Sequence, residues 1–318
     1  MSGDGQLVIS LDFELFWGVH DYRAIDECRD RLMTTREVVP ALLDTFEQFD
    51  VRATWATVGF LFADGRDEAL AHSPDDRPTY ECDRYSPYPH LERTGTSEAD
   101  DPLHFAPSLI ERIRETPGQE IGSHTFSHYF CLEEGQRLAA WRADLSAARA
   151  IAERRGVDLT SLVFPRNQVA PAYVEAAGDA GFASFRGPPG VSFYEPWARD
   201  GRTVWGRAAR LLDAHVPLAG PITHELDGAG RPVDVPASRM LRPWRPATAP
   251  FAPLRGRRIR REMRTAAENG ECFHLWWHPH NFGAFPEQNL SFLRRILGDF
   301  AELRADEGMK SVTMAEVA

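Results

Sequence analysis

The feature that most constrains the fold is a repeated alternation of short apolar segments with longer amphipathic ones. Short apolar runs predict buried strands, and apolar side chains spaced by three and four residues predict helices. In Thr35–Phe49, for example, this spacing puts Val38, Leu42 and Phe46 on one face. Repeated strand–helix units along a chain of 318 residues predict an α/β fold with a parallel sheet.

Seven strands and seven helices are expected from this pattern. The expected strands are Leu7–Leu11, Val51–Val58, Glu120–Ser123, Ser161–Phe164, Phe182–Phe185, Glu271–Trp277 and Lys310–Thr313. The expected helices are Thr35–Phe49, Ala106–Glu115, Glu133–Arg155, Pro171–Ala180, Gly201–Ala214, Arg257–Asn269 and Glu287–Glu307. Because polar motifs follow several of the strands, we expect a (β/α) barrel of about seven parallel strands, in which function gathers at the strand ends.

Two long segments interrupt the alternation, residues 63–105 and 187–253. Both are rich in proline and lack clear periodicity, except for the one helix expected inside the second. Loops of this length in a compact enzyme are usually lids or substrate-binding walls. We therefore predict a single domain, residues 1–318, with two long loop insertions over its site.

Bulk composition excludes several classes of function. The formal net charge of −11 argues against a nucleic-acid partner, because phosphate contacts need a basic face. No apolar run approaches the roughly eighteen residues of a membrane span. The scattered cysteines predict reduced thiols, and the absence of a charged, apolar leader predicts a cytoplasmic location. The oligomeric state is not predicted.

Chemically active side chains follow three of the expected strands. Asp12 and Glu14 end the first apolar run, and strand alternation puts them on one side. His124 and His128 are four residues apart, which predicts that they share one side of a helical turn. His278 follows a strand near the other end of the chain. Two imidazoles and one carboxylate form an open site suited to Zn²⁺, so these clusters predict a hydrolytic metal centre.

The same clusters resemble a known family. Asp-Phe-Glu at 12–14, Ser-His-Thr-Phe-Ser-His at 123–128, Phe-Pro-Arg-Asn-Gln at 164–168 and Leu-Trp-Trp-His-Pro at 275–279 resemble successive motifs of the polysaccharide deacetylases. The resemblance runs in order from about Leu7 to Thr313. It implies a distorted (β/α) barrel and a divalent metal, for which we expect Zn²⁺. It also implies removal of N-acetyl or O-acetyl groups.

Carried over position by position, the resemblance implies a role for each motif residue. Asp12 would be the general base, and His278 the general acid that protonates the leaving group. Glu14, His124 and His128 would bind the metal.

The third motif implies two further roles. Arg166 would pair with Asp12 and keep that carboxylate ionised. A backbone N–H near Asn167 or Gln168 would help to stabilise the oxyanion. The family's fourth motif, an aspartate and a tryptophan that orient the acidic histidine, has no clear counterpart, and Asp200 and Asp213 cannot be assigned to it.

Several aromatic side chains are candidates for contact with substrate. Trp17 is expected at the rim of the cleft, and Trp277 or Trp276 could stack on a sugar ring. His274 and His280 flank His278, and either could replace it as the acid, but each is expected to be a supporting or surface residue. His280 is also a candidate for contact with substrate.

These observations predict a metal-dependent hydrolase that removes an N-acetyl (or O-acetyl) group from a sugar-containing substrate or precursor. The expected partner is an acetylated small molecule or oligosaccharide. One alternative is hydrolysis of a non-sugar C–N bond of the cyclic-amide type. A second alternative is a non-catalytic carbohydrate-binding relative. Motifs of serine hydrolases, nucleotide-driven enzymes and dinucleotide-dependent enzymes are absent from the sequence.

Overall fold

A computed structural model gives the structure of residues 4–191, 220–226, 228 and 230–318. Within these residues nine strands form a single sheet, and every paired strand runs parallel to its neighbours. The strands are β1 (Gln6–Phe13), β2 (Ala53–Thr57), β3 (Gln119–Ser123), β4 (Ser161–Leu162), β5 (Ser184–Phe185), β6 (Val233–Asp234), β7 (Arg239–Met240), β8 (Cys272–Trp277) and β9 (Lys310–Val312).

The strand order is β6-β5-β4-β3-β2-β1-β8-β7, with β9 paired to the first half of β1. A single segment of chain, 233–240, pairs first with β5 and then with β8, so it bridges the two edges of the curled sheet. The predicted α/β barrel is therefore confirmed. Its two short strands β6 and β7 were not predicted, because two-residue strands in a Pro- and Gly-rich segment leave no periodic signal.

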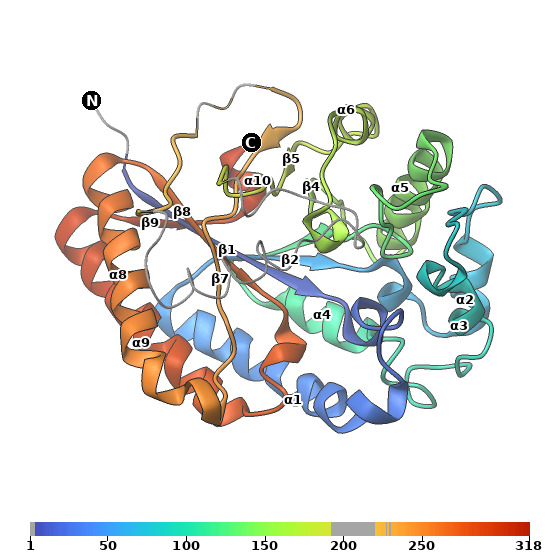
Figure 1. Ribbon diagram of the computed structural model, residues 1–318, viewed down its shortest axis with the longest axis horizontal. Helices are drawn as coiled ribbons and strands as arrows, with labels where there is room; N and C mark the ends of the chain where they lie inside the picture. Colours follow the sequence, from blue (N-terminus) through green and yellow to red (C-terminus); the bar gives the residue numbers. More distant parts are fainter. Residues whose placement is uncertain (1–3, 192–219, 227, 229) are drawn as a thin grey trace.

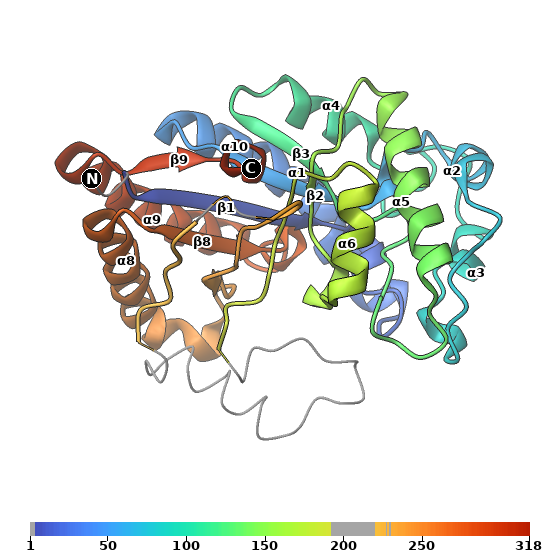
Figure 2. The same cartoon turned by 90° about the horizontal axis from the view of Figure 1, so that it is seen from above.

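Helices surround the sheet, with α1, α8 and α9 on one side and α5 and α6 on another (Figure 1). In the view from above, β1 and β8 run side by side through the middle of the molecule (Figure 2). Seven of the eight residues of β1 are buried, as expected for a strand that is covered on both faces. The helices are α1 (Ile25–Phe49), α2 (Arg66–His72), α3 (Tyr88–Leu91), α4 (Pro107–Glu115), α5 (Leu138–Glu153), α6 (Pro171–Asp179), α8 (Ala252–Asn269), α9 (Pro286–Glu307) and α10 (Met314–Val317).

Helix starts differ from the prediction by five residues or more at three places, one of which is α8, which begins at Ala252 and not at Arg257. Helix α1 begins ten residues before Thr35, because Cys28 and Leu32 continue its buried face toward the N-terminus. Helix α5 begins five residues after Glu133, because the preceding residues form turns. The helix expected at Gly201–Ala214 lies outside the described residues.

The first long loop, 63–105, contains the short helices α2 and α3 and packs over the end of β1. The backbone N–H of Phe16 donates to Leu103 O at 3.2 Å, and the indole N–H of Trp17 donates to His104 O at 2.8 Å. These bonds hold the loop against the turn that follows Glu14. Among the described residues we find no helix whose length and apolarity would suit it to a bilayer.

Candidate active site

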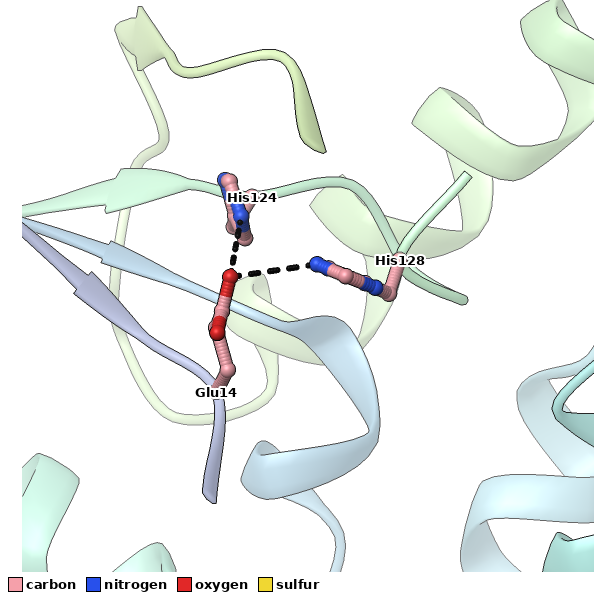
Figure 3. Close-up of side chains that lie close together, drawn as sticks. All are labelled: Glu14, His124 and His128. Atoms are coloured by element: carbon pink, nitrogen blue, oxygen red, sulfur yellow. Dashed lines mark hydrogen bonds and ion pairs between the residues drawn. The ribbon is translucent and has the colours of Figure 1, made fainter. Parts of the chain in front are cut away.

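Three side chains meet at the C-terminal ends of β1 and β3. Glu14 directly follows β1, His124 directly follows β3, and His128 comes from the loop beyond it (Figure 3). The Nε2 atoms of His124 and His128 lie 3.0 and 3.1 Å from the same oxygen, Glu14 Oε1. All three side chains are buried. The sequence-based prediction that these residues converge is therefore confirmed as geometry.

The histidine pair does not lie on a helical turn, so that part of the prediction was wrong. Residues 124–128 form a loop in which Thr125 and His128 have left-handed backbones, with φ of 66° and 56°. The buried Asp144 carboxylate of α5 accepts the backbone N–H groups of Phe126 at 2.7 Å and Ser127 at 3.2 Å. Asp144 therefore fixes the loop between the two imidazoles, in place of helical hydrogen bonds.

The donor set of this cluster fits a divalent metal. Nδ1–H of His124 donates to the carbonyl oxygen of Val163 at 2.8 Å, so it is Nε2 of this ring that faces Glu14. Burial lowers the pKa of His128 to about 4, which keeps that ring neutral at pH 7. Two imidazole nitrogens and a carboxylate oxygen within 4.8 Å of one another form a site that a cation would stabilise.

Asp12 lies beside this cluster and is paired with Arg186, an arginine that was not among the predicted site residues. Nη1 and Nη2 of Arg186 donate to the two carboxylate oxygens of Asp12 at 2.6 and 2.8 Å. Burial acts to raise the pKa of Asp12, but Arg186 together with the nearby His124 and His278 outweighs it and holds that pKa below its usual value. Asp12 is therefore ionised at neutral pH. The predicted pairing of Asp12 with Arg166 was wrong.

Arg166 instead pairs with Asp21 and lies 3.5 Å from Glu133. Its guanidinium is 3.7 Å from the centre of the Phe130 ring. Arg166 still lines the catalytic pocket, but its charge is directed toward the loops around β1 and β3. The error has a structural cause, since Arg186 already binds both carboxylate oxygens of Asp12, and Arg166 extends from a tight turn with φ of 58° to Asp21.

His278 completes the group of titratable side chains. Its Nε2 lies 3.7 Å from Asp12 Oδ2 and 3.8 Å from Glu14 Oε1, and its side chain is 22% exposed. The side-chain amide of Asn281 donates to His278 Nδ1 at 3.3 Å. In the neutral ring the proton is then on Nε2, which faces the carboxylates. Asn281 therefore orients this histidine, a role for which the sequence offered no candidate. Asp200 and Asp213, considered above, lie outside the described residues.

The site opens into a pocket of about 320 Å³. Trp276 lines this pocket, whereas the neighbouring Trp277 is fully buried and stacks on Phe282. Trp17 is also fully buried, against Phe60. The predictions that Trp277 and Trp17 contact substrate were therefore wrong. The pocket is lined by Asp12, Glu14, Gly18, Tyr22, His128, Arg166, Asn167, Trp276 and His278.

Asn167 and Gln168 were also predicted to contact substrate, and only the first of them lines the pocket. Asn167 lines the pocket, and its Oδ1 accepts Arg186 Nη2 at 2.8 Å. Gln168 is buried behind the pocket, where Nε2 donates to Glu133 Oε1 at 2.7 Å. The backbone N–H groups of Asn167 and Gln168 already donate to Phe164 O and Pro165 O, so neither is available to an oxyanion.

Two further histidines lie inside the protein. His280 is buried with Nδ1 3.8 Å from Glu14 Oε2, and it is not among the residues that line the pocket. The prediction that it contacts substrate is therefore not supported. His274 lies in the core, where Nδ1–H donates to Val235 O at 3.0 Å.

Comparison with known proteins agrees with this geometry. A family model described as polysaccharide deacetylase matches residues 25–185, which is half of the chain. The protein belongs to the polysaccharide deacetylase family. The matched region contains His124, His128 and Arg166. Family membership supports a carbohydrate deacetylase as the class of enzyme. No curated protein matches the sequence.

Solved structures of similar fold extend the likeness of this deacetylase-family chain over its whole length. A candidate polysaccharide deacetylase from Mycobacterium smegmatis aligns with a TM-score of 0.60 at 15% identity, covering 99% of this chain and 89% of the other. A second candidate polysaccharide deacetylase, from Pseudomonas aeruginosa PAO1, gives 0.58 at 11% identity, covering 98% and 89%. The allantoinase Puue gives 0.55 at 12% identity, covering 98% and 88%. These similarities establish the shared barrel fold.

Sequence reasoning missed three residues of the site: Arg186, Asn281 and Tyr22. Arg186 directly follows β5, the same position at a strand end that identified Asp12 and His124. That signal was available. Asn281 ends the short 3₁₀ helix Pro279–Asn281 after β8, and Tyr22 lies in the turns after β1; nothing in their local sequence distinguishes them.

Proposed function

We propose that this deacetylase-family protein is a metal-dependent hydrolase that removes an N-acetyl (or O-acetyl) group from a sugar-containing substrate. The observation that carries the proposal is the meeting of Glu14, His124 and His128 at one point, with Asp12 and His278 lining the same pocket. Such a group provides metal ligands, a base and an acid within reach of one bound acetyl group.

The residues that would hold the metal are Glu14, His124 and His128, and the neutral imidazoles favour Zn²⁺. A bound divalent metal lowers the pKa of a coordinated water and polarises the acetyl carbonyl. The protein's own contribution is to fix the three ligands. Val163 orients His124, and Asp144 holds the loop that carries His128.

Asp12 is the proposed general base. Its carboxylate is ionised at neutral pH and cannot rotate freely, because Arg186 binds both of its oxygens. It takes the proton of the attacking water. Arg186 is in turn held by Asn167, so the base, its guanidinium and the pocket wall form one connected network.

His278 is the proposed general acid. Its Nε2 faces the pocket beside Asp12, and the side-chain amide of Asn281 lies beside its Nδ1. As the imidazolium, His278 donates its Nε2 proton to the departing nitrogen (or oxygen) as the bond to the acetyl carbon breaks, and the neutral ring remains. Acetate and a free amine (or alcohol) result.

The test is acetate release from acetylated amino sugars by the zinc-loaded protein. Asp12→Asn is expected to lower turnover by about 10²- to 10⁴-fold while metal content stays unchanged. Asp306→Asn, an exposed aspartate on α9, is the matched control. Turnover of cyclic ureides without any acetate release would favour the cyclic-amide alternative. Sugar binding without turnover would favour the non-catalytic alternative.

A further inference from the structure

A second pocket, of about 400 Å³, lies next to the catalytic one. The two are connected through one pair of side chains. His278 lines the catalytic pocket, Asn281 lines the second, and the two side chains are 3.3 Å apart. The short segment Pro279–Asn281 thus separates the pockets, and the proposed acid lies at their boundary.

The lining of the second pocket is cationic and aromatic. Arg31 from α1 and Arg245 from the segment before α8 both face it, together with Trp244. No lining residue is acidic, although the chain carries 47 acidic against 36 basic residues. Among the described residues neither arginine forms an ion pair, and Nε of Arg31 is buried without a hydrogen-bond partner. Two guanidinium groups in one cavity, with no carboxylate partner in the part of the chain that the structure describes, form a site for an anion.

The walls of this pocket are anchored to the barrel. The backbone N–H of Trp244 donates to Asn289 Oδ1 of α9 at 2.7 Å, and its indole packs edge-on against Phe285 at 5.2 Å. Gly283 approaches the backbone carbonyl of Arg31 so closely that a Cβ there would overlap with it. The cationic pocket is therefore built into the fold, because its walls come from α1, from residues 243–247 and from the segment between β8 and α9.

The position of the general acid places the sugar of the substrate beside the second pocket. A general acid has to lie beside the leaving atom, so the sugar, which departs as the amine or alcohol, lies on the side of His278. We propose that the second pocket binds an anionic group, phosphate or carboxylate, carried by the acetylated sugar substrate. Trp244 covers an apolar face of the ring, and the two guanidinium groups bind the anion. This inference rests on the proposed deacetylase function and narrows its substrate class.

The test compares neutral and anionic sugars in two independent assays on the zinc-loaded protein. Acetate release is measured with N-acetylglucosamine, N-acetylglucosamine 6-phosphate and N-acetylmuramic acid. Calorimetric binding is measured with the deacetylated pair, glucosamine and glucosamine 6-phosphate, so that it does not depend on turnover. We expect at least one anionic sugar to have a KM or Kd about tenfold or more below that of its neutral counterpart, the gain typical of a charge-assisted hydrogen bond.

Variants assign this preference to the pocket. Arg31→Gln and Arg245→Gln are each expected to reduce the anionic-over-neutral preference about tenfold, and the exposed Arg264→Gln on α8 should leave it intact. Because Arg245 is exposed, its variant keeps the test valid if Arg31→Gln fails to fold. Equal KM and Kd values for neutral and anionic sugars would overturn the inference. An anionic-over-neutral preference that persists in a variant carrying both Arg31→Gln and Arg245→Gln would also overturn it.

The two assays separate this inference from the proposed function. Acetate release without any anionic preference would support the deacetylase and refute the anion site. An arginine-dependent preference in binding, with no acetate released from any of the sugars, would support the anion site and refute deacetylation of these compounds.

Discussion

Replacing Arg186 by methionine tests the electrostatic core of the proposed mechanism. The side chain is fully buried and binds Asp12 through two hydrogen bonds of 2.6 and 2.8 Å, with a further bond of 2.9 Å to Ser10 Oγ. Methionine preserves much of the volume but removes the charge. Asp12 would then be a buried carboxylate without a partner, which costs about 3–5 kcal/mol of unfolding free energy at pH 7.

The sign of the pH dependence follows from the direction of the pKa shift. In the wild type the pKa of Asp12 is lowered, so its stabilising contribution is present above the unfolded-state value of about 3.9 and is lost as pH falls through the folded-state value. In Arg186→Met the strongest lowering influence is gone, burial dominates the weaker influence of His124 and His278, and the pKa is expected to rise above about 3.9. The folded variant then gains stability relative to the wild type as pH falls below its raised pKa. The stability deficit should therefore shrink between pH 7 and pH 4.5.

The assay is urea unfolding of both proteins at pH 7 and pH 4.5 with the metal chelated, together with the pH profile of acetate release. The acid limb of that profile should move to higher pH in Arg186→Met, because a protonated Asp12 cannot act as the base. Arg166→Met is the matched control, since Arg166 lines the same pocket but pairs with Asp21. An acid limb that moves in Arg166→Met and stays in place in Arg186→Met would refute the assignment.

Three further predictions concern the metal ligands and the pocket wall. Glu14→Ala and His128→Ala should each lose bound zinc, and a folded variant with a full equivalent of metal by elemental analysis would contradict the ligand set. Gly18→Ala should weaken zinc binding measured by competition with a chelator, since its new Cβ would overlap with the Glu14 carboxylate; unchanged affinity would mean that the turn relaxes freely. Trp277→Ala should cost about 3–5 kcal/mol of stability, measured by denaturant unfolding, as a core truncation. Trp276→Ala should mainly raise KM. A large loss of stability in Trp276→Ala with a raised KM in Trp277→Ala would show that the two side chains face the opposite way.

The barrel and the ligand cluster could be predicted because each depends on local sequence. Apolar runs mark the strands, and in a parallel sheet the residues that follow the strands gather at one edge. Glu14 and His124 follow β1 and β3, so their convergence required only the correct order of strands. The prediction placed His128 beside Glu14 correctly, although it assumed a helical turn where the structure has a loop. Its imidazole reaches Glu14 from a loop that Asp144 holds, a contact 18 residues from Phe126 in sequence.

The sequence did not show which of two adjacent residues in a strand faces the pocket. Trp276 and Trp277 are adjacent in β8, so one must face the pocket and the other the surrounding core. Composition does not distinguish two identical side chains. Pairing of β8 with β1 decides the question, since it turns Trp277 toward α1, where it packs at 6.3 Å from Phe46.

The sequence by itself determined the family, the barrel and the identity of the three metal-binding candidates, because residue type and order along a parallel sheet are enough to gather them. Tertiary structure alone decided that Arg186, 174 residues from Asp12, is its partner. An ion pair of this kind depends on the curvature of the sheet and on the reach of a side chain across its interior. Neither quantity is encoded in the local pattern of residues around Asp12 or Arg186.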